Sequence, residues 1–339
     1  MRIVFFGSPE AALPSLQALI EAGHEIPLIV TQPDKPAGRG RKTAACPVKA
    51  FAAEQGFSVI QPERIRKDET VLDRLREARP DIHVVIAYGR IIPDPILYLP
   101  RWKTLNVHFS LLPKYRGASP VQWAVLNGEI MTGVTIIELN DKMDEGDMLA
   151  AEGTEIGPNE TAGMLEARLA DIGAALLVKT LEGISRGSVV RQPQNHTEAT
   201  YAPKIAKSDG LIDWTTSAES VERKVRAFQP WPTAFTFLGP TRIVVRSGRI
   251  SIAPSVETSH GPAARAFHDP AFPPDSQTPP AGSILSIEKD GLAVSCGGGS
   301  AYLIEIVQPE GRTAMAAYAY AIGARIAPGS SLGNPDPHG

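Results

Sequence analysis

The chain has 339 residues, of which 43% are hydrophobic and 21% are charged, and its formal net charge is −3. Such a length suits two domains, and the composition is that of a soluble protein with a buried core. The net charge gives no indication of a nucleic-acid binder, although local patches decide that question rather than totals.

The cysteine content and the hydropathy of the sequence indicate the cellular compartment of the protein. Cys46 and Cys296 are the only cysteines, which argues against a disulfide scaffold or a cysteine zinc site and fits a reducing cytoplasm. No segment approaches the ~20 apolar residues of a membrane span, and the N-terminal apolar run is too short for a signal peptide. We therefore expect a cytoplasmic protein without a membrane partner.

Strands alternate with helices through the first half of the chain. Ile3–Phe6 reads as a buried strand, and a helix from Ser8, which can cap it, to about Gly23 precedes a strand at Ile26–Val30. This alternation predicts a doubly wound, mostly parallel, Rossmann-like α/β domain over residues 1–188. The remaining elements expected in it are a helix at 48–55, strands at 82–87, 105–108 and 134–139, and a helix at 160–187.

The first strand-to-helix turn lacks the spaced glycines that a dinucleotide pyrophosphate needs. Gly7 is followed by Ser8, Pro9 and Glu10, so a nicotinamide or flavin cofactor is not expected. No phosphate-binding loop of the Walker type and no metal-binding motif occurs elsewhere. The sequence therefore predicts chemistry without a metal ion.

The second half of the chain has a different residue pattern. Residues 189–205 are rich in Gln, Pro, Asn and Thr and read as a linker. Beyond it, a short helix at 218–227 and several strand-like runs predict a small, OB-like antiparallel β-barrel over residues 206–327, with Trp214 and Trp231 in its core. Residues 259–282 read as a long exposed loop and 328–339 as a loose tail. The expected strands are 234–237, 242–245, 250–252, 283–286, 292–294 and 303–306.

Asn106 and His108 form the first chemically informative pair. They are two residues apart on a predicted strand, so their side chains leave the same face, at its carboxyl end. Ligands of open α/β sheets bind beyond that end. An amide donates to a developing oxyanion and an imidazole donates likewise or moves a proton. From the pair alone, a buried Asn and His that satisfy backbone groups is the more common arrangement.

A polar loop, 140–147, follows the strand at 134–139. Its acids fail the spacing of a calcium loop, and Asp141, Glu145 and Asp147 read as a solvated turn. Asp144 is the candidate partner of His108, because a carboxylate orients and stabilises a catalytic imidazole if the loop folds back. The sequence alone does not show that contact.

Two further segments are candidate walls of a flat ligand site. The apolar step Ser110–Pro113 leaves the strand after His108, and Tyr88–Ile92 leaves another strand, with Gly89 permitting close backbone approach. An anchoring loop and an ordinary strand-to-loop turn are equally good readings of these segments.

The spacing of Asn106, His108, Ser110–Pro113 and Asp144 resembles the signature of the folate-dependent formyltransferases, which act on methionyl-tRNA, glycinamide ribotide or sugar amines. The resemblance covers roughly residues 1–327. It implies 10-formyltetrahydrofolate as formyl donor, Asn106 and His108 as ligands of the formyl oxygen, and Asp144 as the residue that holds His108 and assists proton movement. It also implies that the pterin is bound by Ser110, Leu111, Leu112, Pro113, Tyr88, Gly89, Arg90 and Ile91.

Residues 31–42 suggest which molecule accepts the formyl group. This glycine-containing loop carries four basic residues, Lys35, Arg39, Arg41 and Lys42, and taken alone it is an ordinary solvated loop. It resembles, however, the loop that family members acting on methionyl-tRNA insert into the acceptor stem. The resemblance thus implies initiator methionyl-tRNA as partner and substrate of a monomeric enzyme.

The composition of the second domain also bears on which acceptor the protein uses. Residues 204–254 contain eight Lys or Arg against four acids, and a basic barrel is a common nucleic-acid platform. Two alternatives remain: a formyltransferase acting on a sugar or nucleotide amine, and a non-catalytic RNA-binding relative.

Overall fold

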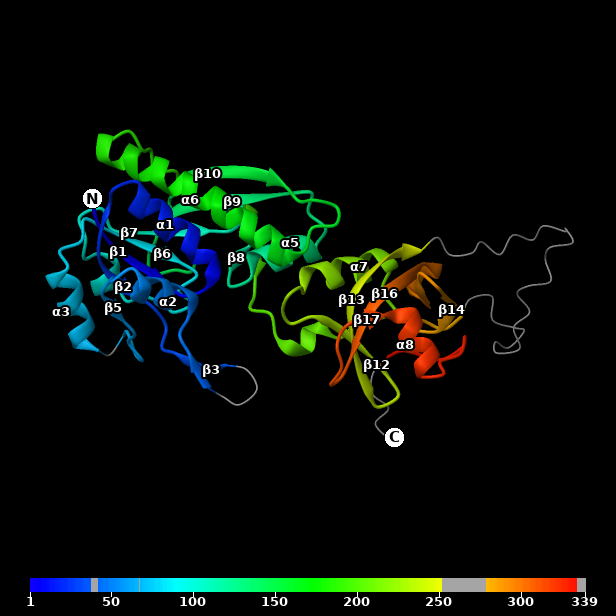
Figure 1. Cartoon of the computed structure of the whole chain (residues 1–339). Helices are drawn as coiled ribbons and strands as arrows, with labels where there is room; N and C mark the ends of the chain where they lie inside the picture. Colours follow the sequence, from blue (N-terminus) through cyan, green and yellow to red (C-terminus); the bar gives the residue numbers. More distant parts are fainter. Residues whose placement is uncertain (38–41, 67, 252–278, 334–339) are drawn as a thin grey trace, which may run out of the picture. The chain divides into compact units, whose positions relative to one another are not determined.

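The computed structural model describes residues 1–37, 42–66, 68–251 and 279–333 (Figure 1). The chain forms two compact units, which we describe separately. Unit 1 comprises Met1–Ala124, Glu129–Pro158 and Met164–Lys204, and unit 2 comprises Val125–Gly128, Asn159–Gly163 and Ile205–Gly339.

Unit 1 is built on a seven-stranded sheet, counted over the described residues, in the order β10-β9-β7-β6-β1-β2-β5. The strands from β7 to β5 are parallel, whereas β9 pairs antiparallel with both β7 and β10. The predicted mostly parallel α/β sheet is therefore confirmed. Its strands are β1 (Arg2–Gly7), β2 (Glu25–Val30), β5 (Val59–Ile60), β6 (Ile82–Ile86), β7 (Thr104–His108), β9 (Met131–Glu138) and β10 (Met148–Glu155).

The central strands are apolar on both faces because helices cover the sheet. Helix α6 lies so close to β7 that a Cβ added at Gly173 would come within 2.8 Å of Val107 Cγ1. The first helix begins differently from the prediction: Ser8 does not cap it, and its hydroxyl accepts a hydrogen bond from Gln32 N instead. The helices are η1 (Glu10–Ala12), α1 (Leu13–Glu21), α2 (Pro47–Glu54), α3 (Glu69–Glu77), α4 (Asp94–Leu97), α5 (Pro120–Leu126) and α6 (Ala162–Arg186).

The predicted linker is wrong for most of its length. Residues up to Lys204 belong to unit 1, where β11 (Tyr201–Ala202) pairs in parallel with β8 (Arg116–Gly117). Met148 and Gln192 exchange two backbone hydrogen bonds, and η2 (His196–Glu198) lies between these pairings. The segment lacks apolar periodicity, yet its backbone groups find partners in unit 1.

Unit 2 contains the predicted antiparallel sheet, in the order β12-β13-β16-β15-β14, with β17 beside β16. The predicted helix is confirmed as α7 (Ala218–Ala227), which begins where the Ser217 hydroxyl accepts a hydrogen bond from Ser220 N. Residues 242–245 and 250–251 of the two expected runs belong to one bulged strand, and residue 252 lies outside the described residues. The elements are β12 (Ala234–Leu238), β13 (Thr241–Ser251), β14 (Ile284–Glu288), β15 (Gly291–Ser295), β16 (Ala301–Pro309), β17 (Met315–Ala316), η3 (Lys207–Gly210), η4 (Gly297–Gly299) and α8 (Ala317–Gly323).

The edges of this sheet are joined through the end of the chain. Gly333 exchanges two backbone hydrogen bonds with Phe237 of β12, and Ser331 bridges Ser283 next to β14. The prediction of a loose tail from residue 328 is therefore wrong as far as Gly333, because strand-edge groups of both sides are satisfied there. Most of the predicted loop at 259–282 and the residues after 333 lie outside the described residues.

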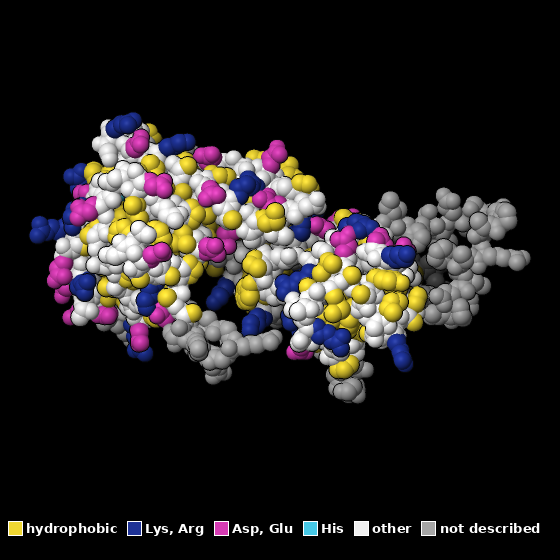
Figure 2. Space-filling view, in the orientation of Figure 1, with side chains coloured by type: hydrophobic (Ala, Val, Ile, Leu, Met, Phe, Trp, Pro, Cys, Tyr) yellow, Lys and Arg dark blue, Asp and Glu magenta, His cyan; other side chains and the backbone are white. Residues whose placement is uncertain are grey.

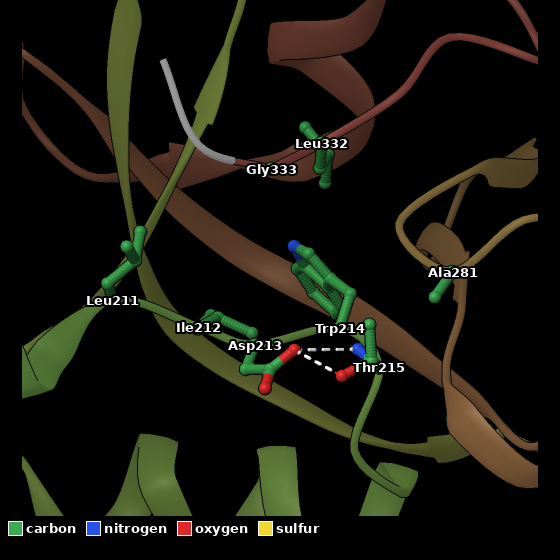
Figure 3. Close-up of a pocket in the computed structure, with 8 residues that line it drawn as sticks. All are labelled: Leu211, Ile212, Asp213, Trp214, Thr215, Ala281, Leu332 and Gly333. Atoms are coloured by element: carbon green, nitrogen blue, oxygen red, sulfur yellow. Dashed lines mark hydrogen bonds between the residues drawn. The ribbon is translucent and has the colours of Figure 1, made fainter. Parts of the chain in front are cut away.

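Leu332 also closes one wall of a small cavity, about 350 Å³, over the indole of Trp214 (Figure 3). Trp214 is core, as predicted, and its Nε1 donates to Thr236 Oγ1 at 3.0 Å. Trp231 is not core, since 48% of it is exposed. Figure 2 shows Lys and Arg side chains beside exposed hydrophobic ones on the visible face of unit 2. Among the described residues, every helix is too short or too polar to cross a membrane.

Candidate functional site

A cavity of about 490 Å³ opens in unit 1 over the carboxyl ends of β6 and β7. Its lining comes from the turn after β6, from the end of β7, from residues 117–122, from the loop after β9 and from α6. Asn106, His108 and Asp144 all line it, so the structure brings together the three side chains that the sequence singled out.

Asn106 and His108 project from the same face of β7 near its carboxyl end. His108 is buried, and Asn106 is partly exposed to the cavity. Within the part of the chain that the structure describes, no residue hydrogen-bonds to the Asn106 amide. The two N–H donors of this amide are therefore available to a ligand oxygen.

The imidazole of His108 is fixed by the backbone just before the short strand β8. Its Nε2 lies 2.9 Å from the carbonyl oxygen of Tyr115. Because a carbonyl oxygen can only accept, Nε2 must carry a hydrogen. The neutral ring then presents an unprotonated Nδ1, which lies 3.8 Å from Asp144 Oδ2. His108 can thus take up a proton on the side that faces a carboxylate.

Asp144 reaches this position because its loop folds back over the sheet. Strand β9 runs opposite to β7, and Leu139, which follows β9, donates its N–H to Thr104 O at the start of β7. The loop returns along β7, with Asp144 in a left-handed backbone conformation (φ 54°). Its Oδ2 accepts a hydrogen bond of 2.8 Å from Gly117 N. The contact that the sequence left open between Asp144 and His108 is present.

The turn after β6 forms one wall of the cavity, which Tyr88, Gly89, Arg90 and Ile91 all line. Gly89 has a φ of +70°, which favours glycine, and a Cβ there would lie 2.6 Å from Gln32 Nε2, so another residue would be strained and would displace the Gln32 amide. Burial raises the pKa of Tyr88 to about 12, although Arg90 opposes the shift. Its hydroxyl has no hydrogen-bond partner among the described residues.

The other predicted wall is wrong for this cavity, because Ser110, Leu111, Leu112 and Pro113 do not line it. They are drawn toward β9 instead: Thr135 Oγ1 donates to Ser110 O and accepts from Leu112 N. The Ser110 hydroxyl donates to Lys114 O. The apolar step anchors the loop that leads to β8.

Two short paired strands form a hairpin at the basic loop. Strands β3 (Lys35–Ala37) and β4 (Lys42–Ala44) pair antiparallel, while Arg39 and Arg41 lie outside the described residues. Next to the hairpin, Asp34 binds Lys49 and Gln61, which hold the pKa of its partly exposed carboxyl below the ordinary value.

Comparison with known proteins shows to which family the chain belongs. The model of the formyl transferase family matches residues 1–181, and that of the formyl transferase C-terminal domain matches residues 204–325. The chain belongs to the formyl transferase family. It is 42% identical to the methionyl-tRNA formyltransferase of Acetivibrio thermocellus, over 98% of this chain and all of the relative. The enzyme of the same name from Citrifermentans bemidjiense is 40% identical, over 99% and 98% of the two chains.

Solved structures share the fold of this formyl transferase. The N-formyltransferase of Helicobacter canadensis, solved with folinic acid and dTDP-3-aminofucose, matches with a TM-score of 0.61 at 15% identity, over 90% of this chain and 98% of that one. HypX from Aquifex aeolicus, solved with tetrahydrofolic acid, matches with the same score at 17% identity. That match covers 99% of this chain, which spans about half of the Aquifex protein.

Three polar residues near the site of this formyl transferase were not predicted from the sequence. Arg116 and Gln194 are buried behind Asp144, 78 residues apart in the chain. Glu166, from α6, lines the cavity, and burial raises its pKa. A charged residue in an otherwise apolar helical stripe was the only available hint of Glu166. Among the described residues, no group of three or more His, Cys, Asp or Glu side chains is placed to hold a metal ion.

Proposed function

We propose that the protein transfers the formyl group of 10-formyltetrahydrofolate to the amino group of methionyl initiator tRNA. The observation that carries this proposal is the convergence of Asn106, His108 and Asp144 in one cavity of a formyl transferase fold. The names of the full-length relatives support the acceptor. In the cell, we expect a cytoplasmic monomer.

The residue types fit the reaction. The neutral amine attacks the formyl carbon, a C–N bond forms, and the carbonyl oxygen gains negative charge. The unpartnered amide of Asn106 is suited to donate to that oxygen. Nδ1 of His108 is suited to take the proton that the amine loses. His108 can then pass this proton to the tetrahydrofolate nitrogen as the bond between that nitrogen and the formyl carbon breaks. Asp144 stabilises the protonated imidazole in between.

The cavity offers features that fit a flat heterocyclic donor. Tyr88 and the close turn at Gly89 would bind the pterin of the folate against Arg90 and Ile91. The donor is consumed as a cosubstrate, and the proposed steps require no metal ion, nicotinamide or flavin. Lys35, Arg39, Arg41 and Lys42 would contact the phosphates of the acceptor stem.

The direct test is transfer of a labelled formyl group from 10-formyltetrahydrofolate to charged initiator tRNA. We expect efficient transfer to initiator methionyl-tRNA and much weaker transfer to elongator methionyl-tRNA. A sugar-nucleotide amine serves as the competing acceptor. Transfer to the sugar alone, or no transfer by folded protein, contradicts the proposal.

A further inference from the structure

Asp144 stands on a loop that has little to hold it in place. Asp141, Lys142 and Met143 are exposed, and Asp144 itself adopts a backbone conformation that is costly for a non-glycine residue. A carboxylate that acts on His108 has to be held within a fraction of an ångström. The structure must therefore supply the restraint from outside the loop.

Gln194 supplies two of the restraints. Its Nε2 donates to Asp144 O at 2.7 Å and to Gly146 O at 2.8 Å, so both amide hydrogens bind the loop on either side of Glu145. The side chain is buried, where each of these bonds is shielded from water. The segment that carries Gln194 is the one that the sequence presents as a linker.

Arg116 fixes the orientation of that amide. Its Nε and Nη2 lie 3.0 and 2.8 Å from Gln194 Oε1. Because a guanidinium only donates, the amide oxygen must face Arg116 and the amide nitrogen must face the loop. Arg116 is 1% exposed, and its charge is balanced by Glu145 at 3.3 Å, with His196 beside it.

The backbone around Arg116 binds both members of the catalytic pair. Tyr115 O accepts from His108 Nε2, and Gly117 N donates to Asp144 Oδ2. The side chain of Arg116 and the side chain of Gln194 are not part of the cavity lining. They can affect the reaction only through the residues that they hold.

We infer that Arg116 and Gln194 are positioning residues, a buried pair that holds the Asp144 carboxylate against Gly117 and opposite His108. This inference rests on the proposed function for its kinetic consequence, but the restraint itself is a property of the folded chain. Loss of the pair leaves the cavity and its ligand contacts intact and displaces the carboxylate.

The test is Gln194→Glu, which keeps the acceptor for Arg116 and replaces the donor to the two loop carbonyls by an oxygen. A misplacement near 1 Å costs on the order of tenfold to hundredfold, so kcat should fall by about that much. KM for both substrates should stay within about twofold, because uniform binding is untouched. Gln17→Glu, on the exposed face of α1, controls for the added charge.

Two further measurements separate positioning from general stability. In an Asp144→Asn background, Gln194→Glu should cause little additional loss of kcat, because both changes act through one carboxylate. Hydrogen exchange of the Gly117 amide should become faster in Gln194→Glu than in the wild type, while core amides of β1 stay protected. The exchange measurement needs no substrate, so it decides the inference even if formyl transfer is absent.

An unchanged kcat, an undiminished loss in the Asp144→Asn background, or an unchanged exchange rate at Gly117 would overturn the inference. If Gln194→Glu does not fold, Gln194→Met is judged by the same criteria, since it retains the length of the side chain and removes all four hydrogen bonds.

Discussion

His108 and Asp144 face one another across 3.8 Å, from Nδ1 to Oδ2, a separation too long for a hydrogen bond but short enough for strong charge interaction. Each is bound by the backbone around β8 rather than by the other: His108 by Tyr115 O and Asp144 by Gly117 N. The imidazole is thus free to gain and lose a proton at Nδ1 without losing its orientation.

Replacement of Asn106 by Ala should lower kcat by about 10²–10³-fold, the usual effect of losing one oxyanion donor. The amide has no partner among the described residues, so its removal leaves no buried group unpaired and the melting temperature should hardly change. Single-turnover formyl transfer and thermal unfolding measure the two effects. A variant with near-normal kcat would contradict the assigned role.

Asp144→Asn should reduce kcat by on the order of 10²-fold, near the lower end of what a positioned proton-transfer group contributes. The new side chain still accepts from Gly117 N, but it no longer stabilises a protonated His108. Asp147→Asn, a change at the end of the same loop and outside the cavity lining, is the matched control and should retain nearly full activity. Equal losses in the two variants would show that the loop, not the carboxylate, matters.

Glu166→Gln should stabilise the fold at neutral pH. Burial raises the pKa of Glu166 above the ordinary value of about 4.3, so the folded state disfavours the charged form. The cost is present above the folded-state pKa and disappears as the pH falls toward that ordinary value. The gain in melting temperature should therefore be largest at pH 7 to 8 and vanish near pH 4. Glu54→Gln, exposed on α2, should show no such trend.

Tyr88→Phe should increase the free energy of unfolding by about 1 kcal/mol, because it removes a buried hydroxyl without a hydrogen-bond partner among the described residues. Tyr115→Phe is the opposite case: it removes the donor of a 2.7 Å bond to Glu129 and should destabilise by a similar amount. Urea denaturation of both variants measures the difference. The same sign for both would refute this reasoning.

Arg39→Ala should weaken the use of tRNA and leave folate binding unchanged. The expected signature is a raised KM for the tRNA with a shallower dependence on salt, since one phosphate contact is lost. Arg64→Ala, a change at an arginine that the structure shows to be exposed, serves as the control. Loss of folate binding in Arg39→Ala would instead move this loop to the donor side of the site.

Local signals in the sequence predicted the sheet and half of the site. Apolar runs and helical spacing placed β1, β7 and α6, because burial is recorded residue by residue in such patterns. The two-residue spacing of Asn106 and His108 fixed their common face for the same reason. These features depend on neighbours in the chain.

Features that depend on distant partners escaped prediction. Gln194 sits in a polar, aperiodic stretch, and its role exists only because Arg116 lies across from it. The antiparallel direction of β9 could not be read from its composition, yet it decides that the Asp144 loop must fold back. The predictions for Ser110–Pro113 and Trp231 were wrong for a related reason. An apolar side chain suggests burial, but it does not indicate which surface the side chain packs against.

The bridges from Ser331 and Gly333 to the edges of the second sheet have a consequence for biosynthesis. Unit 1 is complete once residue 204 has been made, whereas unit 2 cannot join the edges of its sheet until residues 331–333 have left the ribosome. Domains tend to fold in the order of their synthesis. Catalytic and C-terminal units should therefore mature at different times, and a stall or truncation before residue 331 should yield a formed active-site unit attached to an open sheet.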